Sequence, residues 1–272
     1  MLTYKLNDCL SNDQVAALVG TYLDRRSYDL RVQDAAVGFK PDGSVLFTLV
    51  KDAIPQALCN TVYPHLWSVG GQSPASTNRR TAFGPKSGGP NSREAAIGYL
   101  DRDRTGERFP YCRATSFTAN EVERFDAVKP YIKAVDGVFK QYQPARWEAQ
   151  IQRVRLTKAD WVITDTSFTS VAVNRGMRTK AHFDEGDLPE GMGVITALGN
   201  WRGGELIFPK FRVAVAFEPG DVLLCDVHEL HANAPIAGER VSSVFFYRRR
   251  MVECGTPAEE KQHANRVWGK VR

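Results

Sequence analysis

The sequence has few cysteines and no long hydrophobic run. These two features argue against a disulfide-rich protein and against a transmembrane protein. Its 272 residues include five scattered cysteines with no CxxC pair. An odd number of dispersed cysteines predicts neither a disulfide framework nor a cysteine zinc site, and it favours a reducing compartment. No apolar stretch approaches the length that spans a bilayer, and the N-terminus lacks the order of a signal peptide. We therefore expect a cytoplasmic or nuclear protein without a membrane partner.

The sequence also lacks a strong excess of charge of either sign. Its 36 basic and 31 acidic side chains give a net charge of +5, which would help to attract a polyanion but does not by itself reveal one. The distribution says more, because Arg79, Arg80 and Lys86 share one segment rich in Gly, Ser, Pro and Asn. Arg248 and Arg249 belong to a run of three arginines. These residues are candidates for phosphate contacts, and a solvated basic surface explains them equally well.

Two segments in the first half of the chain have the pattern of helices, with a long loop rich in Gly, Pro, Ser and Asn between them. The first begins with a capping box formed by Ser11 and Gln14 and continues with apolar residues at helical spacing. The second is predicted to be capped by Thr118 with Glu121. Pro130 should kink or split this second helix.

Short apolar runs separated by turn residues dominate the chain from about residue 150. Each is rich in Val, Ile, Leu or Phe, as in "TSVAVN", "MGVITALG", "GELIFP", "RVAVAF", "DVLLCD" and "VSSVFFYRR". This pattern predicts a mainly antiparallel sandwich, barrel or jelly roll with the helices packed outside it. We expect one α+β domain over 1–272, with a helix-rich part and a long basic loop at 1–150, a β core at 151–250 and a tail at 251–272.

A histidine and a carboxylate with one residue between them lie in the segment "KAHFDEGDLPEGMG", between two expected strands. On extended backbone His182 and Asp184 would project from the same face and could hold one ion together. Alone, this pair is a weak signal that a polar loop usually explains. A second histidine would complete a facial set of two histidines and one carboxylate, which leaves coordination positions open, as a non-haem iron(II) oxygenase requires.

The segment "GDVLLCDVHELHANAPIAGER" offers two histidines for the missing position. We favour His231 over His228, because His231 ends the segment and Arg240 follows nine residues later. An arginine that enters the next strand is well placed to bind a carboxylate of a dicarboxylate co-substrate through two parallel hydrogen bonds. His228 is then expected to lie behind the site or at the surface. The order of these residues on expected strands favours a metal site over a polar loop.

With these motifs the sequence resembles the TET/JBP-type 2-oxoglutarate- and iron(II)-dependent dioxygenases, which oxidise the 5-methyl group of pyrimidines in nucleic acid. The similarity is densest in "VNRGMRTKAHFDEGDLPEGMGV", "GGELIFP", "GD" and "LHAN", over residues 168–248, and is looser in "NRRTAFG" and "GYLDRDRTGERFPYCRATSFT". The order of the motifs is typical of the superfamily, and their residues are typical of this branch. Without the cysteine-rich region of the animal enzymes, the chain is similar to the compact phage, fungal and algal forms.

The resemblance implies a double-stranded β-helix, or jelly-roll, core. It implies His182, Asp184 and His231 as iron ligands and Arg240 as the residue that binds the far carboxylate of 2-oxoglutarate. Asn174 matches an asparagine of the family motif, which we place at the co-substrate or at the base.

The resemblance also implies cofactors and a nucleic-acid partner. Asp187 matches an acidic position close to the metal in an algal relative that uses ascorbate, so the co-substrate stays open, although Arg240 favours 2-oxoglutarate. The expected cofactors are Fe(II), O2 and 2-oxoglutarate, with ascorbate as the alternative. The expected partner is DNA with a methylated pyrimidine base, which must be flipped out of the duplex. Arg79, Arg80 and Lys86 would then contact neighbouring phosphates.

The expected function is oxidation of 5-methylcytosine in DNA to 5-hydroxymethylcytosine. Thymine carries the same methyl group and differs at the Watson–Crick edge, so it is the alternative substrate. Two further hypotheses stay open. An iron oxygenase of this fold could act on a protein or a small molecule, and a panel of substrates would reveal it. A non-enzymatic β-sandwich binding module would retain no iron and release no succinate.

Overall fold

The computed structural model describes the chain except for residues 71–79, 82–83, 86–92, 104–108 and 270–272. Its helices are α1 (Asn12–Leu18), α2 (Gln56–Gly70), α3 (Ser116–Asn120), α4 (Val122–Tyr142), α5 (Pro144–Leu156) and α6 (Pro257–Gly269). Its strands are β1 (Leu2–Lys5), β2 (Leu30–Val32), β3 (Ala36–Phe39), β4 (Val45–Val50), β5 (Arg80–Thr81), β6 (Gly84–Pro85), β7 (Arg93–Leu100), β8 (Arg113–Ala114), β9 (Ser170–Arg175), β10 (Gly193–Gly203), β11 (Leu206–Phe208), β12 (Val213–Val215), β13 (Val222–Cys225), β14 (Ala232–Asn233) and β15 (Ile236–Phe246). Within this described part of the chain, none of the helices has the length and the hydrophobicity that crossing a membrane requires.

The chain divides into two compact units whose segments alternate along the sequence. The first unit comprises Met1–Ala95, Val173–Glu185 and Gly193–Val244, and the second comprises Ala96–Ala172, Gly186–Met192 and Phe245–Arg272. The boundaries fall within β7, β9 and β15, so each of these strands contributes residues to both units. The expectation of one catalytic domain over the whole chain stays a prediction.

The first unit is built around two β-sheets with a hydrophobic core between them. In the larger sheet, the neighbouring strands of the first unit follow the order β1-β3-β4-β13-β10-β15. The smaller sheet has the order β14-β11-β12-β2. The pairs β3–β4, β4–β13, β13–β10, β11–β12 and β11–β14 are antiparallel. Phe47 and Leu223 of the larger sheet and Phe208 of the smaller sheet belong to one buried cluster. The expected α+β class with a jelly-roll core is confirmed.

Helix α1 begins as the sequence predicts, and its Val15 packs on the outer face of the smaller sheet. The Ser11 side chain accepts a hydrogen bond from the Gln14 N–H, and the Gln14 side chain accepts one from the Ser11 N–H, which is the expected capping box. Soon after the helix ends, Gly20 adopts the left-handed backbone region with φ of 78°. Val15 packs with Ile207, whose side chain faces away from the core between the sheets.

The N-terminal part of the chain also contributes strands, which corrects the expectation of helices packed outside a later β core. Strands β1, β3 and β4 extend the larger sheet and β2 extends the smaller one. Val50 of β4 pairs with Val222 of β13, a residue far along the sequence. Because strand preference depends on such distant partners, short local runs do not reveal it. The β core therefore draws on residues from both 1–150 and 151–250.

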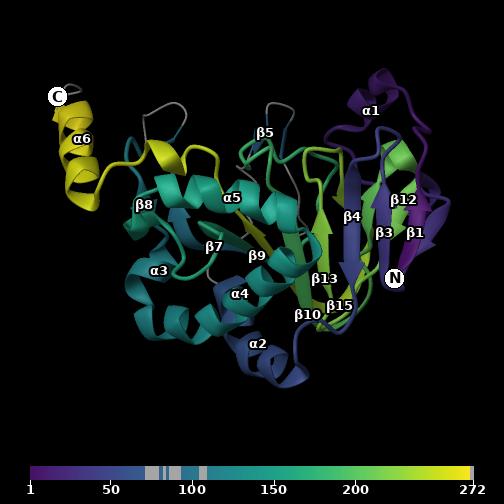
Figure 1. Cartoon of the computed structure of the whole chain (residues 1–272), viewed down its shortest axis with the longest axis horizontal. Coiled ribbons are helices and arrows are strands. Elements are labelled where there is room, and N and C mark those ends of the chain that lie inside the picture. Colours follow the sequence, from purple (N-terminus) through teal and green to yellow (C-terminus); the bar gives the residue numbers. More distant parts are fainter. Residues whose placement is uncertain (71–79, 82–83, 86–92, 104–108, 270–272) are drawn as a thin grey trace. The chain divides into compact units, whose positions relative to one another are not determined.

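The second unit is mainly helical, and α4 and α5 contact one another within it (Figure 1). Helix α4 buries an apolar face and runs without a break through Pro130, so this proline does not split it. The expected cap is wrong as well. The N-cap residue of α4, Glu121, makes no side-chain cap hydrogen bond, and the Thr118 hydroxyl instead accepts a hydrogen bond from the Gly98 N–H.

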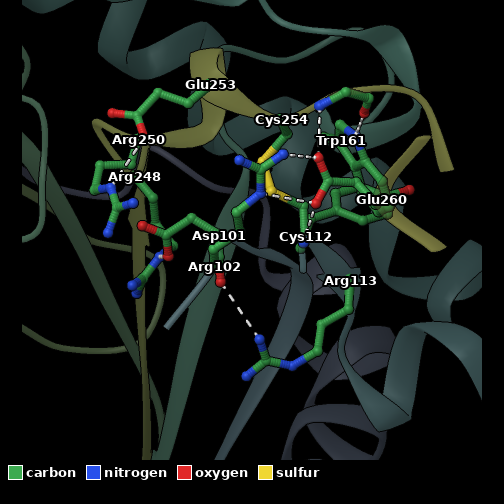
Figure 2. The surroundings of a disulfide bond; sticks show 12 residues. Asp101, Arg102, Cys112, Arg113, Trp161, Arg248, Arg250, Glu253, Cys254 and Glu260 are labelled. Atoms are coloured by element: carbon green, nitrogen blue, oxygen red, sulfur yellow. Dashed lines mark hydrogen bonds and ion pairs between the residues drawn. A yellow bond between two sulfur atoms is a disulfide. The ribbon is translucent and has the colours of Figure 1, made fainter. Parts of the chain in front are cut away.

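A disulfide joins Cys112 to Cys254 in the second unit (Figure 2), so the expectation of no disulfide is wrong. Beside it, the carboxylate of Glu260 on α6 is buried. This carboxylate accepts hydrogen bonds from the Cys112 N–H at 2.8 Å, the Gly255 N–H at 2.7 Å and the Arg102 guanidinium at 2.5 and 3.0 Å. Residues 251–272 are therefore not a simple tail, because the disulfide holds Cys254 just before α6 and Glu260 within α6 makes polar contacts.

Candidate metal centre

The backbone holds His182 and His231 directly opposite each other. They form an isolated antiparallel bridge in which each N–H donates to the carbonyl oxygen of the other, with N···O distances of 3.0 and 3.1 Å. Residues paired in this way present their side chains close together. The two ring centroids lie 4.4 Å apart, and both side chains are buried. The structure thus brings together two histidines that are distant in sequence.

Asp184 completes the group. Its N–H donates to the Val227 carbonyl oxygen at 3.0 Å, which fastens the segment that follows His182. Asp184 Oδ1 lies 3.6 Å from His182 Nε2, and Oδ2 lies 3.7 Å from His231 Nε2. One possible ligand atom from each of the three residues lies within 4.8 Å of the other two. Two imidazole nitrogens and one carboxylate oxygen form the facial donor set of non-haem iron oxygenases.

Backbone carbonyl groups orient both imidazole rings. His182 Nδ1 lies 2.7 Å from the Lys180 carbonyl oxygen, and His231 Nδ1 lies 2.9 Å from the Glu229 carbonyl oxygen. A carbonyl oxygen only accepts, so each Nδ1 must carry the proton in these hydrogen bonds. Each Nε2 is then able to present its lone pair on the side of Asp184. Metal-binding histidines commonly donate their other N–H in this way, so the local geometry suits a divalent cation.

Arg240, on β15, is a buried cation with an unsatisfied donor. Its side chain is 2% exposed, and its Nε has no hydrogen-bond partner in the described part of the chain. The guanidinium carbon lies 5.5 Å from the Trp201 ring centroid and 5.3 Å from that of Phe217. Burial lowers the pKa of Arg240 to about 10, against the raising effect of Glu205, so Arg240 is still charged at neutral pH. A buried cation with a spare donor fits the carboxylate of a bound ligand.

Asn174 lies near the end of β9. The Gly176 N–H, just after this strand, donates to the Arg240 carbonyl oxygen at 2.8 Å, so the end of β9 runs beside β15. Asn174 itself is partly buried. This position is compatible with a role at the co-substrate or at the base, which stays a prediction.

Comparison with known proteins identifies the family. Residues 96–249, more than half of the chain, match the Tet/JBP family, the oxygenase domain of the 2OGFeDO superfamily. The chain belongs to the Tet/JBP oxygenase family. It is similar to thymine dioxygenase JBP1 of Trypanosoma brucei brucei, with 33% identity over 175 residues that cover 61% of this chain and 20% of that protein. For JBP1 of Leishmania braziliensis the identity is 32% over 159 residues, covering 55% of this chain and 19% of that protein.

Other relatives cover more of this chain. The bifunctional helicase and thymine dioxygenase JBP2 of Leishmania major is 25% identical over 264 residues, which cover 94% of this chain and 23% of that protein. The chain thus spans only about a fifth of the length of these curated relatives. Among solved structures, NgTET1 in complex with 5mC DNA has a TM-score of 0.61 and 17% identity, with 85% of each chain covered. This likeness shows the Tet/JBP oxygenase fold, and the expected family is confirmed.

The residues of this Tet/JBP chain fit the metal and the co-substrate that the superfamily implies. Fe(II) would be held by His182, Asp184 and His231, whose donor atoms converge as described above. The outer carboxylate of 2-oxoglutarate would satisfy the buried guanidinium of Arg240.

His228 is placed apart from the metal group. Its Nδ1 lies 3.3 Å from Asp226 Oδ1, and the Lys40 ammonium lies 2.9 Å from Asp226 Oδ2. Burial tends to raise the pKa of Asp226, but His228 and Lys40 outweigh it and hold that pKa well below its usual range. His228 therefore belongs to a cluster of charged groups, as expected for a histidine that does not bind the metal.

The other acidic and basic candidates lie in the second unit. Asp187 is 9% exposed, and its backbone forms an isolated bridge with Arg248. Arg248 Nε lies 2.5 Å from Asp101 Oδ1 (Figure 2), so a carboxylate already compensates its charge. Arg249 is exposed. The roles expected for Asp187 at the substrate or DNA and for the arginines at phosphates stay predictions.

The basic loop candidates fall at the edge of what the structure describes. Arg79 and Lys86 lie outside the described residues, and Arg80 lies in the short strand β5. Two basic residues outside the predicted set, Arg178 and Lys180, precede His182 at alternate positions. Alternation on extended backbone places side chains on one face, so this spacing was a usable signal.

Proposed function

We propose that the chain is an Fe(II)- and 2-oxoglutarate-dependent dioxygenase that hydroxylates the 5-methyl group of a pyrimidine base in DNA. The observation that carries the proposal is the convergence of His182, Asp184 and His231 in a chain of the Tet/JBP family. Arg240 supports it by supplying a buried cation for a carboxylate ligand. We place the reaction in the cytoplasm or the nucleus, where DNA is accessible.

The roles of the chain's own residues follow from their contacts. When bound, iron and 2-oxoglutarate supply the dioxygen-dependent chemistry that oxidises a methyl C–H bond. The carbonyl groups of Lys180 and Glu229 keep the two imidazoles in the tautomer that leaves Nε2 for the metal. Arg240 orients the co-substrate through charge-assisted hydrogen bonds. Because the oxidant comes from the bound groups, no catalytic triad or acid–base pair is required.

Arg240 also bears on the choice of co-substrate. Its guanidinium is buried and has a spare donor, so it needs an anionic partner with the planar shape of a carboxylate. The co-substrate 2-oxoglutarate carries two carboxylates, and ascorbate carries none. We therefore propose 2-oxoglutarate, with ascorbate as the alternative that Asp187 would favour.

Two pyrimidines of DNA carry a 5-methyl group, and each has support. The structural likeness to NgTET1 with 5mC DNA supports 5-methylcytosine, which we favour, with 5-hydroxymethylcytosine as the product. The names of the curated relatives, thymine dioxygenases at 32% and 33% identity, support thymine as the second candidate. Either base would have to leave the base stack to reach the metal group.

Mass spectrometry of nucleosides tests the proposal. The protein is incubated with Fe(II), 2-oxoglutarate, O2 and DNA that contains either 5-methylcytosine or only the four common bases. Formation of 5-hydroxymethylcytosine supports the favoured substrate, and formation of 5-hydroxymethyluracil supports thymine. Succinate release with neither product would direct the search to a protein or a small molecule.

Two variants make this experiment specific. His182→Ala should abolish product formation, because it removes one of the three donor groups. His228→Ala is the matched control, since it removes a nearby histidine that lies outside the metal group, and it should retain activity. Product formation by His182→Ala at the rate of the unchanged protein would contradict the proposal.

A further inference from the structure

Tyr22 is exposed although the backbone around it is fastened beside the metal group. The Gly20 N–H donates to the Ala181 carbonyl oxygen, and the Ala181 N–H donates to the Thr21 carbonyl oxygen, both at 2.8 Å. Ala181 directly precedes His182 in sequence. The Tyr22 side chain is nevertheless 43% exposed. A segment that is hydrogen-bonded to Ala181 thus presents an aromatic ring to solvent, close in the chain to His182 of the metal group.

Two cations lie against this ring. The guanidinium carbon of Arg178 is 4.8 Å from the Tyr22 ring centroid, and the Lys180 ammonium is 5.3 Å from it. Both distances are within the range of cation–π attraction. Arg178 Nη2 also donates to the Leu23 carbonyl oxygen at 2.6 Å. Tyr22 and its neighbour therefore keep the two positive groups close together, and this set of Tyr22, Arg178 and Lys180 is the Tyr22 cluster.

Neither of the two cations has a carboxylate within ion-pair distance in the portion of the chain that the structure describes, and Asp24 attracts Arg178 only at longer range. Neither Arg178 nor Lys180 forms an ion pair there, and Arg178 Nε is buried without a hydrogen-bond partner. Asp24, the acidic residue of the same segment, pairs with Arg26 at 2.8 Å. Hydrogen bonds from Arg26 lower the pKa of Asp24 most. The positive charge of Arg178 lowers this pKa least.

The arginine run near the end of the chain differs in this respect. Arg248 pairs with Asp101 at 2.5 Å, and Arg250 pairs with Glu253 at 3.2 Å. To bind another anion, these arginines would have to give up their hydrogen bonds to Asp101 and Glu253 or divide their donors between two anions. The Tyr22 cluster is therefore better suited to attract an external anion.

We propose that Arg178 and Lys180, positioned by Tyr22, bind phosphate groups of the DNA backbone beside the base that is oxidised. This inference rests on the proposed function. Lys180 precedes His182 by two residues, and its carbonyl oxygen lies 2.7 Å from His182 Nδ1, so the Tyr22 cluster adjoins the metal group along the chain. A flipped base leaves its own phosphates at the mouth of the site, so contacts there hold the strand in register.

DNA binding at several salt concentrations tests the inference. Fluorescence anisotropy measures the affinity for a labelled duplex that contains 5-methylcytosine, with the protein loaded with Fe(II) under anaerobic conditions. Each lost phosphate contact reduces the slope of log K against log salt by about 0.9, which corresponds to about 8-fold in affinity at 0.1 M salt. We expect Arg178→Ala/Lys180→Ala to reduce the slope by about 1.8.

Matched variants separate a local contact from general charge. Arg26→Ala removes one positive charge from the same segment, but this residue is already paired with Asp24, so the slope should not change. Lys180→Glu breaks no described hydrogen bond. It replaces the double variant in the salt-dependence measurement if loss of Arg178 prevents folding. Tyr22→Phe keeps the ring and should bind DNA as the unchanged protein does, whereas Tyr22→Ala should weaken binding.

The outcomes distinguish this inference from the function on which it rests. Iron content, and succinate release without DNA, should be unchanged in Arg178→Ala and Tyr22→Ala, since neither residue contacts the metal group. If the unchanged protein oxidises and binds DNA while Lys180→Glu and the double variant keep its salt slope, the inference is wrong and the function stands. An equal loss in Arg26→Ala also overturns the inference. If the unchanged protein binds no DNA, the inference and the proposed substrate fail together.

Discussion

Loss of the Cys112–Cys254 disulfide should lower the free energy of unfolding substantially. The two cysteines are 142 residues apart in sequence, so the bond closes a long loop in the unfolded chain. The chain-entropy model gives about 5 kcal/mol at 25 °C for a loop of this length. Measured effects of single disulfides are commonly smaller, at about 2–4 kcal/mol. We therefore expect the double variant Cys112→Ala/Cys254→Ala to lose roughly 2–5 kcal/mol.

The contacts around the disulfide indicate what survives its loss. The Glu260 carboxylate still accepts hydrogen bonds from the Cys112 N–H and from Arg102, and neither bond involves a sulfur atom. Trp161 Nε1 still donates to the Gly255 carbonyl oxygen at 2.6 Å. The folded state should thus keep α6 in place, and the effect should arise mainly in the unfolded chain.

Urea unfolding followed by tryptophan fluorescence is the assay, because Trp161 is buried in the cluster that contains the disulfide. Reductant should lower the midpoint of the unchanged protein to that of the double variant, and it should leave the double variant unaffected. Cys9→Ala removes an exposed cysteine outside the disulfide and should respond to reductant as the unchanged protein does. If the midpoint stays constant while thiol titration shows that the bond is reduced, the reasoning is refuted.

Four further substitutions test other parts of the structure. Arg240→Met should raise the KM for 2-oxoglutarate roughly ten- to hundredfold, as expected for a lost charge-assisted hydrogen bond, while iron content stays the same; succinate release measures this. Burial raises the pKa of Glu260, but its hydrogen-bond donors outweigh burial and hold that pKa below its usual value. The stabilisation from Glu260 is therefore present at neutral pH and is lost as the pH falls through the lowered pKa, so Glu260→Gln should reduce the acid sensitivity of the urea midpoint. A Cβ at Gly193 would lie 2.3 Å from Val227 Cγ1, so Gly193→Ala should cost about 1–3 kcal/mol in urea unfolding. Gly137→Ala, where nothing lies within 4 Å, should instead stabilise α4 by about 0.5–1 kcal/mol.

The metal group could be anticipated, although His182 and His231 are distant in sequence, because each of its residues lies in a short motif. His182 and Asp184 are separated by one residue on extended backbone, which is sufficient to place both side chains on one face. The choice of His231 over His228 relied on its position before Arg240, and the structure pairs His231 with His182 through the backbone. Each of these steps needed only short-range spacing and the order of motifs along the chain.

Features that depend on distant partners were missed. The pairing of β4 with β13 and the bond between Cys112 and Cys254 join segments far apart in sequence, and connectivity of this kind does not follow from local patterns. The cap expected at Thr118 failed because its hydroxyl bonds to Gly98, on another element. The expectation that DNA is bound by the basic loop remains untested at Arg79, which lies outside the described residues.

Metal content is the most direct test of the central claim that His182, Asp184 and His231 form one iron site. Equilibration with Fe(II) under anaerobic conditions, followed by elemental analysis, should give one ion per chain for the unchanged protein and for His228→Ala. His182→Ala and His231→Ala should each lose the ion. Retention of one Fe(II) with unchanged affinity in either of these two variants would contradict the account.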